Sequence, residues 1–212
     1  IKLFLVRGDP KRLRTAELSN WTGKAVAGPR SELDGIVARE ESEGAGVYLL
    51  AGTGAETGRP AIYIGEAEVI RDRIKAHLSK DFWNHVVFFV SKDETLTKAH
   101  IRFLEGRLIE LARSAGRAVV TNNQSSGARL PESDREDMEV YLAKVNQLLP
   151  VLGVDLLVPP AQKKKGGPEG RLLFCEIKGV RARGHLSPDG LVVLEGSQAV
   201  LQERASTKKY PA

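Results

Sequence analysis

Short apolar runs divide the first ninety residues into a series of predicted strands. Residues 1–7 and 24–27 carry runs that favour strands, with the turn SNWTG between them. The runs GVYLL and AIYIG predict strands near 46–51 and 61–65, and a glycine-rich loop separates them. The segment NHVVFFVS at 84–91 is apolar and rich in Val and Phe, which predicts a third, buried strand.

Polar start signals and apolar periodicity predict helices between and after these strands. Start signals at a proline and a serine, followed by a glycine stop, predict a helix near 31–42. Thr97 is the expected N-cap of a helix over 97–114, which a glycine ends. Ser133 is expected to cap a further helix over 133–149.

Composition changes sharply near the C-terminus. The stretch PPAQKKKGGPEG at 159–170 combines proline, glycine and a lysine triplet, which is typical of a linker. The strand-like runs and the turn SPDG that follow predict a small β-rich domain over 171–212. The sequence before the linker divides into a strand and helix extension over 1–45 and a domain with a trailing helix over 46–158.

Composition and charge set the class of protein. The chain has 212 residues, 42% of them hydrophobic and 28% charged, as in ordinary globular proteins. No apolar run approaches the roughly 20 residues of a membrane helix, and the N-terminus lacks the pattern of a signal peptide, so we expect a cytoplasmic protein without a membrane partner. One cysteine excludes an internal disulfide. The net charge of +5 favours polyanionic partners without identifying one.

Two tyrosines occupy equivalent places in the paired strands near 46–51 and 61–65. Residues two apart share a strand face, so Tyr48 shares its face with Gly46 and Leu50. Tyr63 likewise shares its face with Ala61 and Gly65. Small neighbours leave space around each ring, and both hydroxyls could face one shallow concavity. The alternative is that tyrosine is simply a favourable strand residue.

A charged helix follows the second strand. Its apolar stripe is Ile70, Ile74 and Leu78, and Arg73 and His77 lie four apart on one flank of that stripe. A guanidinium beside an imidazole suits phosphate chemistry, because the first holds the anion while the second moves a proton. A partly buried helix histidine without a functional role is an equally good interpretation of His77.

Glu105 has an apolar environment in the next helix. Its helical neighbours are Ile101, Leu108, Ile109 and Ala112, so its carboxylate is expected on the buried face. A buried carboxylate is costly unless it is paired or holds a metal. A structural ion pair is one interpretation. The other is a site for a hard divalent ion, since Mg²⁺ often takes only one or two protein carboxylates.

Asn122 and Asn123 follow this helix. An asparagine amide can orient a phosphate or a water by hydrogen bonding. Ordinary loop chemistry explains the pair equally well on composition alone.

In this order, these positions resemble the GIY-YIG nuclease superfamily. The two strand motifs are GVY at 46–48 and YIG at 63–65. The family's arginine lies eight residues beyond the YIG glycine, as Arg73 does here, and its metal-binding glutamate is matched by Glu105 in LEGRLIEL. The resemblance covers about residues 46–123.

The resemblance implies an α+β fold, with a small three-stranded antiparallel sheet flanked by helices, a short N-terminal strand extension and a small β-rich C-terminal module. It also implies hydrolysis of DNA phosphodiester bonds at a single-metal site. Glu105 would hold Mg²⁺ or Mn²⁺, and Arg73 would stabilise the charge of the transition state.

The same resemblance assigns roles to the other polar residues. Tyr48, assisted by His77, would activate or position water, while Tyr63 would shape the site or bind the phosphate. Asn122 would orient groups near the metal, with Asn123 as the alternative. Since free tyrosine has a pKa near 10, a base role requires a lowered value. Which of Tyr48, Tyr63 and His77 takes the proton stays open.

The flanking sequences are similar to a bacterial subgroup of the family, in which a Pro-Arg pair precedes the nuclease module and a C-terminal domain of unknown function follows it. Candidate contacts to duplex or branched DNA are Lys75, Asn123, Lys163, Lys164, Lys165, Arg181 and Arg183. The lysine run is also typical of a solvated linker. An active nuclease, a non-cleaving DNA-binding module and a regulatory or defence-related protein with a nuclease effector remain the functional hypotheses, and the oligomeric state is open.

Overall fold

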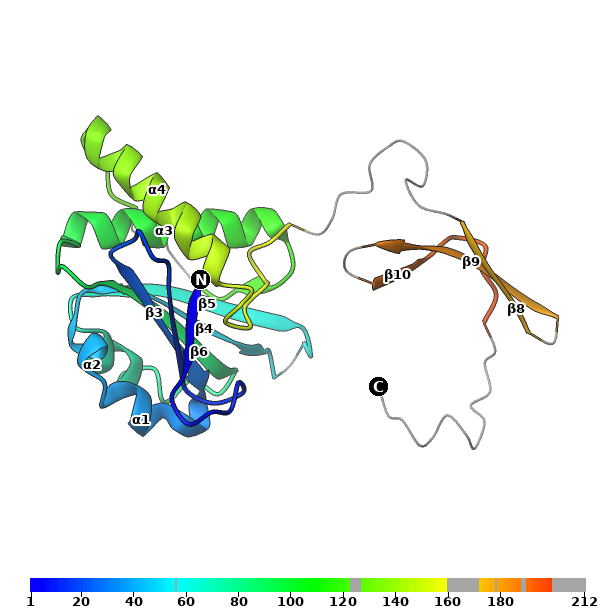
Figure 1. Ribbon diagram of the computed structural model, residues 1–212, viewed down its shortest axis with the longest axis horizontal. Coiled ribbons are helices and arrows are strands. Elements are labelled where there is room, and N and C mark those ends of the chain that lie inside the picture. The colour runs from blue at the N-terminus through cyan, green and yellow to red at the C-terminus, as the bar shows by residue number, and fades with distance from the viewer. Residues whose placement is uncertain (56, 123–126, 160–171, 178, 188–189, 200–212) are drawn as a thin grey trace. The chain divides into compact units, whose positions relative to one another are not determined.

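The protein consists of two compact units, Ile1–Ala161 and Gln162–Ala212. The structure, a computed structural model, describes all residues except 56, 123–126, 160–171, 178, 188–189 and 200–212 (Figure 1).

The first unit is built on a mixed seven-stranded sheet, which corrects the predicted three-stranded sheet. The strand order is β1-β2-β3-β6-β4-β5-β7, antiparallel except for the parallel pair β5 and β7. The strands are β1 Lys2–Leu5, β2 Arg14–Glu17, β3 Gly23–Pro29, β4 Gly46–Thr53, β5 Pro60–Ala67, β6 Trp83–Ser91 and β7 Val119–Val120. The physical reason for the difference is that β3 pairs with β6 along its whole length, so the N-terminal strands extend the central sheet.

Helices cover both faces of this sheet, as Figure 1 shows. The helical elements are η1 Arg30–Glu32, α1 Leu33–Val37, η2 Glu40–Glu43, α2 Ile70–Lys75, α3 Lys98–Ala115 and α4 Glu132–Leu148. Helices α3 and α4 pack on one face, and α1 and α2 pack on the other. The two layers follow from the strands, whose successive side chains point to opposite faces.

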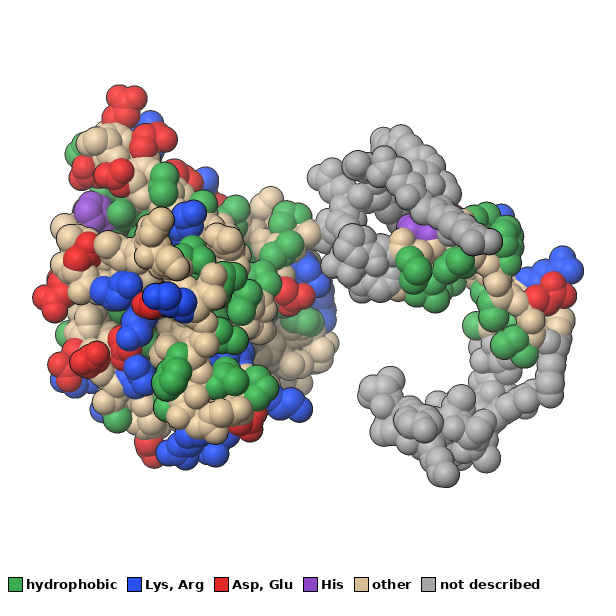
Figure 2. All heavy atoms as spheres, viewed as in Figure 1, with side chains coloured by type: hydrophobic (Ala, Val, Ile, Leu, Met, Phe, Trp, Pro, Cys, Tyr) green, Lys and Arg blue, Asp and Glu red, His purple; other side chains and the backbone are tan. Residues whose placement is uncertain are grey.

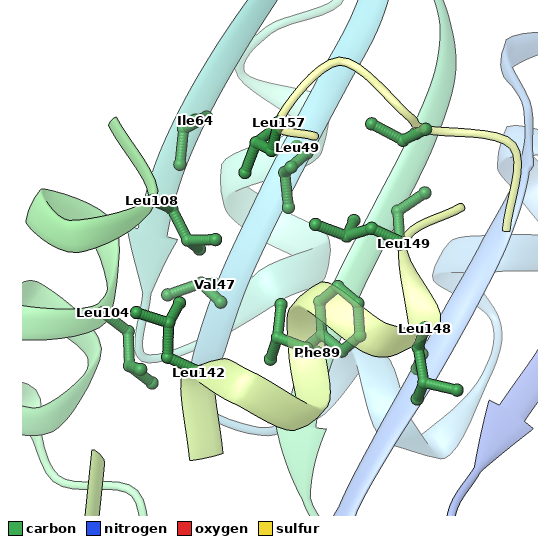
Figure 3. Packing of buried hydrophobic residues seen from close by; sticks show 14 of the residues in the cluster. Val47, Leu49, Ile64, Phe89, Leu104, Leu108, Leu142, Leu148, Leu149 and Leu157 are labelled. Atoms are coloured by element: carbon green, nitrogen blue, oxygen red, sulfur yellow. The ribbon is translucent and has the colours of Figure 1, made fainter. Parts of the chain in front are cut away.

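The core beneath α3 and α4 holds the larger apolar cluster. Val47 and Leu49 of β4 and Phe89 of β6 face Leu104 of α3 and Leu142 of α4, all of them buried (Figure 3). Burying one such side chain contributes about 1.5–3 kcal/mol. The opposite cluster contains Tyr48, Leu50 and Phe88, which alternate with the first set along the same strands. Consecutive side chains of β4 therefore pack on opposite faces of the sheet.

The helix predicted near 31–42 is broken into η1, α1 and η2. The backbone of Arg39 is extended, with φ −79° and ψ 144°. The Ser42 hydroxyl donates to the carbonyl oxygens of Val37 and Arg39, at 2.9 and 2.6 Å. These bonds satisfy acceptors that a continuous helix would otherwise pair, so the break is stable.

The helix after Gly65 is also shorter than its apolar stripe predicts. Helix α2 ends at Lys75, and Leu78, expected on the buried stripe, is 44% exposed. The carbonyl of Leu78 instead accepts a bond of 2.6 Å from Arg30 Nη2, which turns the chain away from the core.

The capping predictions had different outcomes in the two longer helices. Thr97 caps α3 and accepts from the His100 amide at 3.3 Å, and Gly116 ends the helix with φ 64°, so this prediction is confirmed. The prediction that Ser133 caps α4 is wrong. Pro131 is the N-cap residue there, and its fixed φ starts the helix without a side-chain bond.

The second unit contains a three-stranded antiparallel sheet in the order β10-β9-β8. Its strands are β8 Leu173–Ile177, β9 Val180–Ser187 and β10 Gly190–Val193. In the described part of the chain, no helix is long and apolar enough to cross a membrane.

Candidate functional site

Tyr48 lies at the centre of a polar cluster on the α2 face of the sheet. Its side chain is fully buried, and its hydroxyl lies 2.7 Å from Nε2 of His77. Its cross-strand neighbour in β5 is Gly65, so the ring covers a position without a side chain. This explains why a small residue is needed beside the tyrosine.

We expect Gly65→Ala to lower the free energy of unfolding by about 1–2 kcal/mol, because overpacking a buried site displaces its neighbours. The added Cβ would lie 2.3 Å from the Tyr48 hydroxyl oxygen. Urea denaturation measures the change. The control is Gly127→Ala, whose Cβ would meet no heavy atom within 4 Å. Equal stability of the two variants would contradict this account of the packing.

Tyr63 and His77 complete the aromatic part of the cluster. The centroid of the Tyr63 ring lies 6.1 Å from that of Tyr48 and 4.7 Å from that of His77. His77 lies just beyond α2, where its amide donates to the Ile74 carbonyl at 3.0 Å, and its side chain is only 7% exposed. The tight turn at the end of the helix thus directs the imidazole towards the two tyrosines.

Arg73 adds a positive charge at the exposed side of the cluster. It projects from α2 and interacts with Tyr48 and Tyr63, and these interactions, with Tyr48 the largest, raise the pKa of Arg73. Lys80 lies over the ring of Tyr63, with its Nζ 3.9 Å from the ring centroid. In the described part of the chain, no carboxylate forms an ion pair with either cation.

The environment fixes the protonation of Tyr48 and His77 near neutral pH. Burial raises the pKa of Tyr48, and Arg73 only partly offsets this, so the phenol is protonated. Burial, assisted by Lys80 and Arg73, lowers the pKa of His77 to about 4, so the imidazole is neutral. When its proton is on Nδ1, His77 Nε2 accepts the hydrogen bond from the Tyr48 hydroxyl.

Glu105 is buried in α3, as its apolar neighbours predicted, and is 8% exposed. Helix α3 covers the sheet face opposite the tyrosine cluster and packs against β5, the strand that carries Tyr63. The described residues contain no group of three or more metal-ligating side chains. A single carboxylate has the hard oxygen donors that Mg²⁺ or Mn²⁺ prefers, and such ions keep several waters, so the donor chemistry of Glu105 fits one of them.

Asn122 binds the backbone of β5. Its Oδ1 accepts from the Ile64 amide at 3.0 Å, and its Nδ2 donates to the Ile64 carbonyl at 2.6 Å. The side-chain amide of Asn122 therefore pairs with β5 as the backbone of a neighbouring strand would. It fixes the position of β5 at Ile64, between Tyr63 and Gly65. In this arrangement Asn122 positions the strand, and both polar groups of its side chain are already engaged.

The remaining predicted residues are spread over the chain. Lys75 is exposed on α2. Arg181 of β9 pairs with Glu176 at 2.9 Å, and Arg183 on the same strand is exposed. Asn123 and the lysine run Lys163, Lys164 and Lys165 lie outside the described residues.

No site role was predicted for Lys80 from the sequence, and Arg30 was marked only as part of the Pro-Arg pair. Lys80 and Arg30 meet at the loop that follows His77, where Arg30 Nη1 donates to the Lys80 carbonyl at 2.7 Å. The Pro-Arg pair before the predicted nuclease module was the available signal for Arg30. No periodicity marks Lys80, because a turn and not a helix carries it.

Comparisons of this chain with protein-family models, with curated proteins and with solved structures gave no match. The resemblance to the GIY-YIG nucleases therefore stays a prediction that is based on five positions in order along the sequence. What the structure adds is the grouping of Tyr48, Tyr63, Arg73 and His77 on one face of the sheet.

Proposed function

We propose that this protein is a metal-dependent endonuclease that hydrolyses phosphodiester bonds of DNA. The observation that carries the proposal is the 2.7 Å contact between Tyr48 and a neutral His77, beside the guanidinium of Arg73. A cation, a proton acceptor and a hydroxyl at one place are what hydrolysis of a phosphodiester requires.

The charge distribution supports an anionic substrate. Arg73 and Lys80 have no carboxylate ion-pair partner among the described residues, so a phosphate would find both available. Acidic side chains instead gather at the N-terminal end of α4, at the upper left of Figure 2, where Glu132 and Asp134 occupy the first turn. A polyanion would be repelled there and attracted to the cluster.

The protonation states favour His77 as the proton acceptor. A buried phenol with a raised pKa stays protonated and cannot accept a proton, whereas the neutral imidazole of His77 has a lone pair on Nε2 that faces the Tyr48 hydroxyl. The cations Lys80 and Arg73 contribute to the low pKa of His77. A bound phosphate would offset their charge and raise this pKa towards its ordinary value, which makes His77 a stronger base when substrate is present.

The resemblance assigns the divalent ion to Glu105, whose helix covers the sheet face opposite the tyrosine cluster. An ion held there would supply neutralisation of charge on the phosphate and on the leaving oxygen. Arg73 would stabilise the negative charge that grows in the transition state. Tyr48 would hold the attacking water and relay its proton: as the water proton reaches the Tyr48 oxygen, the Tyr48 hydroxyl proton passes to Nε2 of His77. Tyr63 would shape the site beside Arg73 and Lys80.

Nicking of supercoiled plasmid with Mg²⁺ or Mn²⁺ tests the proposal. We expect the wild type to nick, and Glu105→Ala to be at least about 100-fold slower, as for loss of a group that supports the transition state. The matched control is Glu110→Ala on the same helix, which removes a carboxylate that is 63% exposed and paired with Arg107. We expect this control to stay within about twofold of the wild type, as for most surface substitutions.

Two results would contradict the proposal. The first is the absence of cleavage by the wild type on supercoiled, single-stranded and branched DNA. The second is an equal rate for all three proteins, which indicates a contaminating nuclease. DNA binding without cleavage would instead support the non-cleaving module.

A further inference from the structure

Lys80 is a cation of this site that has no assigned role. Its ammonium lies over the face of the Tyr63 ring, 3.9 Å from the centroid, and its pKa is lowered by burial and by Arg73. A partly buried lysine is normally paired with a carboxylate. No carboxylate among the described residues forms an ion pair with Lys80. The charge of Lys80 is therefore available for an anion.

The backbone around Lys80 is fixed by Arg30 and Trp83. Arg30 Nη1 donates to the Lys80 carbonyl at 2.7 Å, and its Nη2 donates to the Leu78 carbonyl at 2.6 Å. The same guanidinium lies 4.5 Å from the centroid of the Trp83 ring. Trp83 in turn donates from Nε1 to the His77 carbonyl at 3.0 Å. Because this loop is already ordered, an anion would bind Lys80 with little further loss of entropy.

Arg73 and Lys80 approach Tyr63 differently. Arg73 interacts electrostatically with Tyr48 and, more weakly, with Tyr63, whereas Lys80 covers the ring face of Tyr63. The two cations still repel each other enough to lower the pKa of Lys80. Two neighbouring cations on a rigid frame match two neighbouring negative charges better than one.

We propose that Lys80 forms a second phosphate subsite, which binds the phosphate next to the one held by Arg73. The ligand class is a nucleic-acid strand with at least two consecutive phosphates. This inference rests on the proposed function, since it assumes that Arg73 holds the phosphate to be cleaved. It assigns Lys80 to substrate binding and leaves the chemical step to Arg73, His77 and Glu105.

The first test measures binding without cleavage. A labelled DNA duplex is titrated with protein in EDTA at several salt concentrations, and fluorescence anisotropy gives the dissociation constant. For Lys80→Met we expect about tenfold weaker binding at low salt and a salt slope smaller by about 0.9, the value for one lost phosphate contact on duplex DNA. Lys80→Arg should retain most of the slope.

The matched control is Lys144→Met, which removes the same charge from α4 on the opposite sheet face. The affinity of Lys144→Met for the DNA duplex should stay within about twofold of that of the wild type. Equal losses for Lys80→Met and Lys144→Met, or an unchanged slope for Lys80→Met, would overturn the subsite. Circular dichroism confirms that each variant is folded.

The second test separates the subsite from the chemical step. Bis(4-nitrophenyl) phosphate carries one phosphate, so Lys80→Met should change the KM for this substrate by less than about twofold while the KM for DNA rises about tenfold, as the loss of one charged contact implies. Lys80 also lowers the pKa of His77, so the comparison uses KM and not kcat. An equal rise of KM for both substrates would overturn the subsite. If the wild type binds DNA and cleaves nothing, the proposed function fails, and the salt slope alone decides the role of Lys80.

Discussion

Replacing Arg73 by methionine is expected to slow plasmid nicking by at least about 100-fold, or roughly 2.7 kcal/mol of transition-state stabilisation. Arg73 is exposed on α2, where it interacts with Tyr48 and Tyr63, and no described carboxylate forms an ion pair with it. Its charge is therefore available where negative charge develops on the phosphate. Single-turnover nicking at saturating protein isolates this effect from binding.

The matched control for Arg73 is Arg71→Met. Arg71 lies on the same helix but forms an ion pair of 2.5 Å with Glu43. We expect this control to change the rate less than about threefold, since exposed ion pairs contribute little. Neither substitution should change the free energy of unfolding by more than about 0.5 kcal/mol, because both side chains are at the surface. Equal losses of rate in both variants would mean that Arg73 contributes only general positive charge.

The central strands of the sheet were predictable from local sequence, whereas the width of the sheet was not. Alternating or continuous apolar runs marked β4, β5 and β6, because side-chain burial sets those patterns. Strand β2 has the sequence RTAE, and its Arg14 and Thr15 read as polar although both are buried. Arg14 is accommodated by donating to the Leu152 carbonyl at 2.6 Å, a contact 138 residues away. Such distant partners leave no periodic signal.

The positions of the site residues were predictable where the local pattern of a strand or of a strand pair determined them. Tyr48 and Tyr63 meet because paired strands place them on one face. His77 reaches Tyr48 for a different reason from the one predicted, since a turn and not a continuing helix carries it. Lys80 depends on bonds from Arg30, which lies 50 residues earlier, so only the tertiary structure reveals it.

The buried imidazole of His77 predicts a specific dependence of stability on pH. Its pKa is about 4 in the folded protein, against an ordinary value of 6.5. The unfolded chain therefore binds a proton at higher pH than the folded chain does. The contribution of His77 to stability is complete above pH 6.5, is lost as the pH falls from 6.5 to 4, and is constant below that.

We expect the wild type to lose about 2 kcal/mol more than His77→Gln when the pH falls from about 7 to about 4.5. Glutamine keeps a polar group near Tyr48 but does not titrate, and the other titrating groups, including the half-buried His85, are common to both proteins. Urea denaturation followed by tryptophan fluorescence gives the difference, and an NMR titration of the His77 ring gives its pKa directly. Parallel pH profiles, or a ring that titrates near 6.5, would show that His77 is open to water. The neutral His77 on which the proposed proton transfer depends would then lose its physical basis, even if the protein cleaved DNA.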